Sequence, residues 1–287
     1  MLPQKYEFDV VIPVHERDKP ILEHCINGVR KNLIGVRRII TVSKEKYTKN
    51  AEWIDEAIFP FSYDLVKSYR DGKSTGWFFQ QLLKMYSPIV IPDILPNVMV
   101  LDSDTVFFRK IPMFDKKGCA FYNLSKGQRK ECHTFTAAVN THIEEFLPAI
   151  ARKNIPPHFK LFSAISHNMI FNREIMKELF EMVEERDANK DPFYKIFLKN
   201  QSGGVASEYQ IYFNFMMVFH PDLIAIRKLK FKNTSDPNIT KYSIFPKYHF
   251  CSFHHYLRGT KQKSLRNKFR EYFYKIIQKL FVETPVS

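Results

Sequence analysis

A short apolar run that ends in two carboxylates constrains this chain most. Val98 to Leu101 are apolar without interruption and follow the turn former Pro96, which predicts a short buried strand. Asp102 and Asp104 come directly after it. Ligands of open α/β sheets bind outside the carboxyl ends of the strands. Two carboxylates there suit Mg²⁺ or Mn²⁺ carrying a diphosphate, whereas the ordinary interpretation is a turn after a strand.

The composition limits how such a chain can bind phosphate. With 287 residues, 45% of them hydrophobic, it is long enough for one large α/β domain with a sizeable core. It contains only 9 glycines and has neither a Walker-type loop nor a Gly-x-Gly-x-x-Gly pattern. Phosphate binding is therefore expected from a metal ion and from basic side chains.

Charge and cysteine content bear on partners and compartment. The formal net charge of +14 favours anionic partners such as nucleotides, nucleic acid or an anionic membrane surface. The four cysteines are scattered without a Cys-x-x-Cys pair, the N-terminus is polar, and no stretch of 18 apolar residues occurs. The sequence thus predicts a reduced, cytoplasmic protein without a signal peptide or a membrane span.

The N-terminal region predicts a strand–helix–strand unit. Phe8–Val14 reads as a buried strand, a helix with one apolar face begins at Pro20, and Val36–Val42 reads as a second strand. This order is the βαβ unit of a parallel sheet. Further strands are expected at 57–61, 98–101, 105–108, 120–123, 160–172 and 223–231, and helices at 77–86, 141–152, 174–185, 192–199 and 207–219. We expect one α/β domain with a mixed, mostly parallel sheet flanked by helices.

Several of these pieces, in this order, resemble a known family. A Val-Ile-Pro-Val strand precedes a polar loop with Arg70, Asp71 and Lys73, a Trp-x-x-Gln-Gln-x-x-Lys helix, and Leu-Asp-Ser-Asp. The order resembles the nucleotide-sugar transferases of the GT-A fold, most closely their poorly characterised bacterial and viral members. The resemblance spans roughly residues 7–258. It implies a GT-A-like domain with a Rossmann-like sheet over residues 1–258, whose Asp-x-Asp motif holds a divalent ion that clamps the donor diphosphate.

The resemblance also assigns roles to individual residues. Asp104 is expected to contact the metal ion directly, and Asp102 to bind the metal, the ribose hydroxyls or both. The remaining donor-binding residues are Pro13, Val14, His15 and Arg17 at the base, Asp71 and Lys73 at the base or ribose, Gln80 and Lys84 at the phosphates, Ser103 within the motif, and His167 and Asn168 at the transferred sugar. For Gln81 and Lys84, a solvated helix face is the alternative.

A third metal ligand in this fold is often a histidine far along the chain. The candidates lie in the segment Tyr248–His255. On a strand, His249 and His254 would lie on opposite faces, and we favour His249, followed by His254. A zinc site formed by Cys132, His133, Cys251 and His254 is a weaker alternative, because it lacks a zinc-knuckle spacing.

Glu208 opens the helix predicted at 207–219 and is the candidate for acid/base catalysis. It could serve as the general base that deprotonates an acceptor hydroxyl in an inverting transfer. The alternative is an acidic residue stabilised by the helix dipole, an effect worth under about 1 kcal/mol. A retaining transfer would need no such base, and Glu208 would then orient the sugar.

Residues 259–287 form a separate segment. Between Lys261 and Phe281, apolar side chains at helical spacing alternate with lysines and arginines, which predicts a basic amphipathic helix. Such a helix can lie in an anionic membrane surface and give the protein a peripheral membrane contact. It can equally pack on the domain while its lysines extend to solvent.

These observations favour a metal-dependent glycosyltransferase. It would use Mn²⁺ or Mg²⁺ to transfer a sugar from a UDP- or GDP-sugar to a hydroxyl of a glycan, glycolipid or protein glycan. One alternative is a nucleic-acid-binding protein, but the basic residues are not grouped in blocks and no nucleic-acid-reading motif occurs. The other is a nucleotidyltransferase that uses the same two aspartates.

Overall fold

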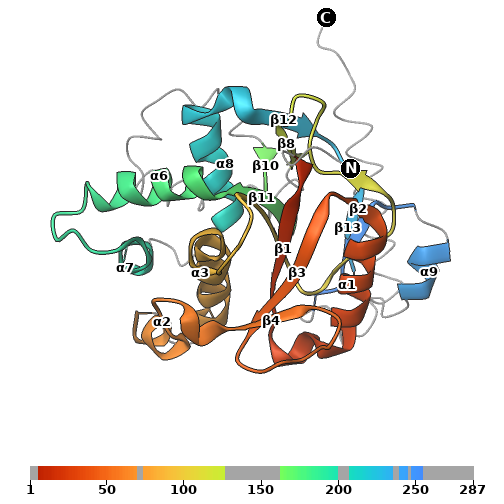
Figure 1. The fold of residues 1–287 in the computed structure, drawn as a ribbon, viewed down its shortest axis with the longest axis horizontal. Coiled ribbons are helices and arrows are strands. Elements are labelled where there is room, and N and C mark those ends of the chain that lie inside the picture. The colour runs from red at the N-terminus through yellow and green to blue at the C-terminus, as the bar shows by residue number, and fades with distance from the viewer. Residues whose placement is uncertain are drawn as a thin grey trace, which may run out of the picture.

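Among the residues that the structure describes, five strands form the central sheet (Figure 1). The computed structural model describes residues 6–69, 74–126, 162–199, 207–234, 239–244 and 247–254. The strand order is β11 (Asn168–Asn172), β5 (Asn97–Leu101), β1 (Phe8–Pro13), β3 (Val36–Ser43) and β4 (Glu52–Asp55). Neighbouring strands are parallel except β11, which runs antiparallel to β5. The predicted mixed, mostly parallel sheet is confirmed.

The predicted βαβ unit is confirmed in β1, α1 (Lys19–Asn32) and β3. Pro20 occupies the first turn of α1, where its missing N–H costs no helical hydrogen bond. The helix buries an apolar face that includes Leu22, Cys25, Ile26 and Val29. Every residue of β1 is buried, as a strand inside a parallel sheet should be.

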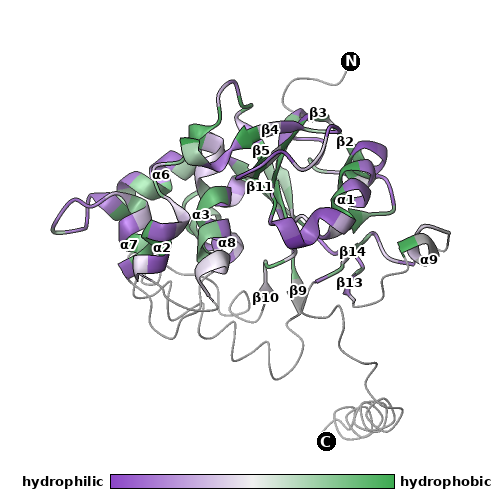
Figure 2. Cartoon of the chain, turned by 90° about the horizontal axis from the view of Figure 1, so that it is seen from below, coloured by the Kyte–Doolittle hydropathy of each residue, from purple (hydrophilic) through white to green (hydrophobic). Residues whose placement is uncertain are grey.

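Helices cover both faces of the sheet. Figure 1 shows α1 on one side and α3 (Thr75–Val90) on the other. Beside α3 lie α2 (Tyr63–Tyr69), α6 (Arg173–Glu184), α7 (Phe193–Lys199) and α8 (Glu208–Phe219). Figure 2 shows hydrophobic central strands, whereas α1 and α6 alternate hydrophobic and hydrophilic residues. This is the pattern of helices that bury one face and expose the other.

Short strands and turns complete the described part of the chain. They are β2 (Leu33–Ile34) paired with β7 (Ile111–Pro112), β12 (Ile224–Arg227) with β8 (Ala120–Asn123), β10 (Phe162–Ser163) with β9 (Ser125–Lys126), the sheet β13 (Phe231–Asn233), β14 (Phe250–Ser252) and β6 (Thr105–Phe107), helix α9 (Ile239–Ile244), and the 3-10 turns η2 (Glu16–Asp18), η3 (Glu56–Ile58) and η5 (Pro221–Leu223).

Three predicted elements differ from the structure. The strand expected at 57–61 is wrong: β4 ends at Asp55, whose side chain accepts a hydrogen bond from the Ala57 N–H and starts η3. The strand expected at 160–172 is divided into β10 and β11, because the backbone at His167 is left-handed, with φ of 61°. The strand expected at 223–231 is likewise divided into β12 and β13.

The helices α6 and α3 differ in whether a side chain caps their first turn. The side chain of Asn172 accepts hydrogen bonds from the N–H groups of Glu174 and Ile175, which fixes the start of α6. Ser74 precedes α3, but its side chain makes no capping hydrogen bond. The helix α3 also extends past the predicted end at Tyr86 to Val90 and contains Pro88.

Some predictions fall outside the described residues. These are the helix at 141–152, Asp71 and Lys73 of the polar loop, Cys132 and His133 of the zinc alternative, and the C-terminal segment 259–287. None of the helices within the described ranges combines the length and the apolar character needed to cross a bilayer.

An ion pair between a buried aspartate and an exposed arginine joins the first two long strands. Asp9 of β1 is fully buried, and its carboxylate accepts hydrogen bonds from Arg37 Nε at 2.9 Å and from the Leu95 N–H at 2.9 Å. Burial by itself raises the pKa of Asp9, but the bonds from Arg37 and Leu95 and the charges of Arg37 and Arg38 outweigh it, so the pKa is lowered. The ionised carboxylate is therefore the form that stabilises the fold.

We expect Asp9→Asn to lower the free energy of unfolding at pH 7 by about 1–2 kcal/mol, because Arg37 and the Leu95 N–H lose a charged acceptor while solvent still reaches Arg37. Since the pKa of Asp9 is lower in the folded state, its contribution is complete at neutral pH and is lost as the pH falls through the folded-state pKa. Urea unfolding of both proteins at a series of pH values from 7 to 3 measures this. The two stabilities should converge in acid, and a constant difference would contradict the assignment.

Candidate functional site

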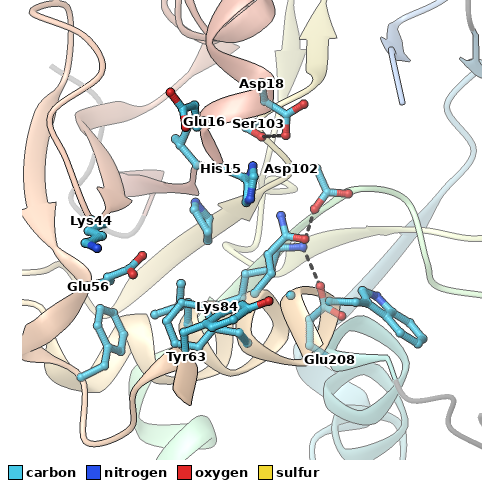
Figure 3. Close-up of a pocket in the computed structure, with 18 of the residues that line it drawn as sticks. His15, Glu16, Asp18, Lys44, Glu56, Tyr63, Lys84, Asp102, Ser103 and Glu208 are labelled. Atoms are coloured by element: carbon cyan, nitrogen blue, oxygen red, sulfur yellow. Dashed lines mark hydrogen bonds and ion pairs between the residues drawn. The ribbon is translucent and has the colours of Figure 1, made fainter. Parts of the chain in front are cut away.

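A large pocket lies at the carboxyl ends of the parallel strands. Its volume is about 1610 Å³, above the roughly 300–1,000 Å³ of pockets for single small ligands. Residues that directly follow β1, β3, β4 and β5 line it. Figure 3 shows Lys44 and Glu56 at one end, and Lys84 between Asp102 and Glu208 at the other. The pocket thus has room for a ligand with two parts.

Most of the predicted site residues share this pocket. The lining includes Pro13, Val14, His15, Arg17, Gln80, Lys84, Asp102, Ser103, Asp104, His167, Glu208 and His254. They come from chain segments between residues 13 and 254, which only the fold brings together. Two other predicted residues, Asn168 and His249, do not line it.

Asn168 has a structural role instead. It is 2% exposed, its Nδ2 donates to the Ser166 carbonyl at 2.7 Å, and its Oδ1 accepts from Asn123 Nδ2 at 3.4 Å. Its side chain therefore holds the turn before β11 and does not line the pocket. Its expected contact with the transferred sugar stays a prediction that these contacts do not support.

The register of β14 against β6 places His254, and not His249, beside Asp104. Ser252 pairs with Thr105, and the Phe253 N–H donates to the Asp104 carbonyl at 2.9 Å, so His254 lies next to Asp104. His249 precedes the strand, and its Nδ1 accepts a hydrogen bond from the Lys230 N–H at 3.0 Å. Its pKa is lowered by burial. His254, and not His249, therefore lies beside Asp104, and the choice of metal ligand stays a prediction.

Asp104 and His254 form one half of the aspartate site. Nδ1 of His254 lies 3.1 Å from Oδ2 of Asp104, and each residue is 8% exposed. Asp104 lies between β5 and β6, and His254 follows β14, so the pairing of β14 with β6 fixes their positions. A carboxylate and an imidazole held together in this way are the donor types that Mn²⁺ accepts.

Asp102 forms the other half and is engaged by the protein on both oxygens. Its Oδ1 pairs with the Lys84 ammonium and accepts from the Tyr209 hydroxyl at 3.4 Å, while its Oδ2 lies 3.0 Å from His167 Nδ1. Burial by itself raises the pKa of Asp102, but the charge of Lys84 and the bond to His167 lower it well below its usual range. Asp102 is therefore a permanent anion at the floor of the pocket.

His167 reaches Asp102 from a strained backbone. A non-glycine residue with φ of 61° is uncommon, and such conformations persist where the surroundings enforce them. The Asp102 N–H donates to the His167 carbonyl at 3.0 Å, which fixes the turn. The ring centroids of His167 and His254 are 4.7 Å apart, so the two aspartate–histidine pairs lie side by side.

Lys84 links Asp102 to Glu208. Its Nζ lies 2.7 Å from Glu208 Oε1 and 3.0 Å from the Tyr209 hydroxyl, and 4.6 Å above the Tyr209 ring. Lys84 is 2% and Gln81 1% exposed, so the solvated helix face considered for these two residues is wrong. Gln81 Oε1 accepts from the Glu208 N–H at 3.0 Å, which joins α3 to the start of α8.

Glu208 itself is buried, at 3% exposure. Burial and the charge of Asp102 raise its pKa, and Lys84 lowers it less, so the net shift is upward. Ser207, not Glu208, caps α8, with its Oγ accepting from the Gln210 N–H. The structure thus gives Glu208 a partner, Lys84, that neither sequence interpretation included.

Sequence reasoning missed several lining residues. Asp18 accepts a hydrogen bond from Ser103 Oγ at 3.1 Å, which ties the loop after β1 to the Asp-Ser-Asp turn. Tyr209 contacts both Asp102 and Lys84. The only sequence signal for either was its position beside a residue already singled out. The aromatic lining residues Tyr47, Phe59, Phe61, Tyr63 and Phe79 carried no signal, because aromatic residues are abundant along the whole chain, and Trp77 was noted only as part of the Trp-x-x-Gln-Gln-x-x-Lys helix.

Three side chains of the pocket are candidates to hold a metal ion. Two carboxylates and an imidazole, from Asp102, Asp104 and His254, are chemically suited to Mn²⁺. In the described ranges, no group of three or more such side chains is arranged to hold an ion. The reason lies in Asp102, whose oxygens face Lys84 and His167, whereas Asp104 and His254 face each other. The chemistry fits, and Asp102 is the ligand that would have to exchange a partner.

Comparisons with known proteins give fold likenesses. Neither a family model nor a curated protein matches the chain. Solved structures do match. Mouse xyloside xylosyltransferase 1, apo form, is 10% identical with a TM-score of 0.43, over 86% of this chain and 97% of that one. The apo structure of the bifunctional glycosyltransferase WbbM is 14% identical with a TM-score of 0.46, over 86% of this chain and 46% of that one.

Both matched structures are transferases of sugars by their names. At these identities, and at TM-scores below 0.5, they carry no conclusion about activity. The pocket and its aspartate–histidine pairs are therefore the ground for a functional assignment.

Proposed function

We propose that this protein is a metal-dependent glycosyltransferase that moves a sugar, of the hexose type, from a nucleoside-diphosphate donor to a hydroxyl acceptor. The observation that supports it is the position of Asp102 and Asp104. They follow β5 on the wall of a pocket of about 1610 Å³, and His254 lies against Asp104. Carboxylates at this edge of an α/β sheet are placed where a nucleotide would bind.

Asp104, His254 and Asp102 would hold the metal ion, Mn²⁺ or Mg²⁺. When bound, the ion supplies charge neutralisation for a departing nucleoside diphosphate. The residues of the chain then orient the donor. Arg17 and Lys44 line the same pocket and add positive charge for the phosphates, while the aromatic lining offers faces for a base or a sugar ring.

Glu208 has a different role in this proposal from the general base expected. A base must be open to the proton that it accepts, and Glu208 is buried and paired with Lys84. We infer that it positions Lys84 beside Asp102. A transfer that retains the anomeric configuration, which needs no separate base, is compatible with this arrangement.

A panel of nucleotide sugars tests the function. We expect one or two UDP- or GDP-sugars to raise the melting temperature by roughly 5 °C at about a hundredfold excess over Kd, and only when Mn²⁺ is present. The same donors should release the nucleoside diphosphate in a turnover assay. A panel without any responding donor would contradict the proposal, and release of pyrophosphate would indicate the nucleotidyltransferase instead.

A further inference from the structure

We propose that Lys84 competes with the divalent cation for Asp102, so that this lysine sets how tightly the pocket binds metal. The inference rests on the proposed function, because it takes Asp104 and His254 as the site where the ion enters. It assigns to Lys84 a positioning role that differs from the phosphate contact expected from the sequence.

The contacts of Asp102 carry the first step. Lys84 pairs with Oδ1 and His167 lies against Oδ2, so a cation that binds Asp102 through Oδ1 would displace Lys84. Asp104 faces the imidazole of His254 instead. The two aspartates therefore differ in the partner that a cation would meet, an ammonium at Asp102 and an imidazole at Asp104.

The other contacts of Lys84 would hold it in place if Asp102 bound a metal ion. Its ammonium is 2.7 Å from Glu208 and 3.0 Å from the Tyr209 hydroxyl, in addition to Asp102. If a metal ion takes Oδ1 of Asp102, Lys84 keeps a carboxylate, a hydroxyl and the face of the Tyr209 ring. The exchange therefore removes one contact of Lys84 and leaves the others in place. Lys84 can return to Asp102 when the ion leaves, so the competition is reversible.

The net charge of the site also affects how strongly it attracts a cation. The formal charge of the side chains of Lys84, Asp102, Asp104 and Glu208 is −2, and it becomes −3 when Lys84 is replaced by a neutral residue. A cation attracted to Asp104 is also repelled by the ammonium beside Asp102. Both the freed oxygen and the lost repulsion act in the same direction, toward tighter metal binding.

Binding of Mn²⁺ alone tests the inference without any sugar donor. Free Mn²⁺ gives a sharp electron paramagnetic resonance signal that broadens when the ion is bound, so a titration yields Kd. We expect Lys84→Met to bind Mn²⁺ at least about tenfold more tightly than the natural protein, within the range by which residues around metal ligands change affinity. A merely structural role of Lys84 would leave the affinity unchanged or lower it.

Two variants separate direct competition from net charge. Lys84→Met/Glu208→Gln restores the formal charge of −2 while leaving Asp102 without its lysine, and it should still bind Mn²⁺ several-fold more tightly. It also avoids leaving Glu208 buried without a partner, so it serves if Lys84→Met does not fold. Lys177→Met removes an exposed positive charge from α6, outside the pocket lining, and should leave the affinity unchanged.

The outcomes distinguish this inference from the function on which it rests. If the natural protein binds Mn²⁺ and both Lys84 variants bind it equally or more weakly, the competition is refuted and the metal site stands. If none of the proteins binds Mn²⁺, or if Asp104→Asn leaves binding intact, the proposed metal site fails and the inference fails with it. Tighter binding by both Lys84 variants, abolished by Asp104→Asn, supports it.

Discussion

Replacing Asp104 with asparagine is expected to lower the rate of sugar transfer by at least about a thousandfold, while the protein stays folded. Asp104 is the carboxylate that faces His254 on the pocket wall, and its loss removes the anionic partner of a metal ion there. Without charge neutralisation, a nucleoside diphosphate is a poor leaving group. The measurement is kcat/KM for the donor identified in the panel, with Mn²⁺ at saturation for the natural protein.

Two further substitutions make the result specific. Asp222→Asn removes the same charge from an exposed turn outside the pocket and should leave the rate unchanged. Asp102→Asn should reduce both the rate and the melting temperature, because Asp102 also holds Lys84 and His167. If Asp104→Asn kept more than a tenth of the activity, the metal would not be bound through this residue.

The sheet and its position relative to the aspartates follow from local sequence. The apolar run before Asp102 and the βαβ unit from Phe8 to Ser43 were predictable, because each depends on a pattern within one segment. Once the strands are parallel, their carboxyl ends share one edge, so the pocket's place was predictable as well. What remained was which distant side chains reach that edge.

The histidines of the segment Tyr248–His255 show why contacts between distant segments could not be predicted. On the strand pattern alone, His249 and His254 were both candidates. The pairing of Ser252 with Thr105 decides between them, since it carries His254 to Asp104. Strand register depends on contacts between segments that are about 150 residues apart here, and nothing within Tyr248–His255 encodes it.

Lys84 and Glu208 illustrate a second kind of miss. Lys84 was expected at the donor phosphates or on a solvated helix face, and Glu208 as a general base or an acid stabilised by the helix dipole. Burial was expected for neither, because a lysine or glutamate is rarely buried without a partner. Their partner is each other, across 124 residues. A pairing of this kind becomes visible only when α3 and α8 are placed side by side. His167 is similar, because no residue pattern predicts a left-handed histidine.

The buried lysine also gives the largest stability effect that we expect. Lys84→Met should lower the free energy of unfolding by about 3–5 kcal/mol, the range for removing one partner of a buried ion pair. The lysine is 2% exposed and pairs with two carboxylates, Asp102 and Glu208, so its loss leaves both anions without their countercharge. Urea unfolding at pH 7 in the absence of divalent ions measures the effect.

Adding Glu208→Gln to Lys84→Met should recover much of the lost stability. In Lys84→Met/Glu208→Gln the buried glutamate charge is gone, so only Asp102 remains unpaired, and His167 still contacts it. We expect the double variant to be more stable than Lys84→Met alone, a coupling that independent residues would not show. Exposed Lys177→Met, which removes a surface ion pair with Glu174, should leave the stability nearly unchanged.

The same comparison separates a buried countercharge from simple packing. If Lys84 stabilised the fold only through its methylene chain, methionine would replace it well, and adding Glu208→Gln would bring no recovery. Adding Mn²⁺ gives an independent check, because an ion bound at Asp102 should stabilise Lys84→Met more than the natural protein. A protein in which neither glutamine nor Mn²⁺ restored stability would show that Lys84 is not the cation that balances these two carboxylates.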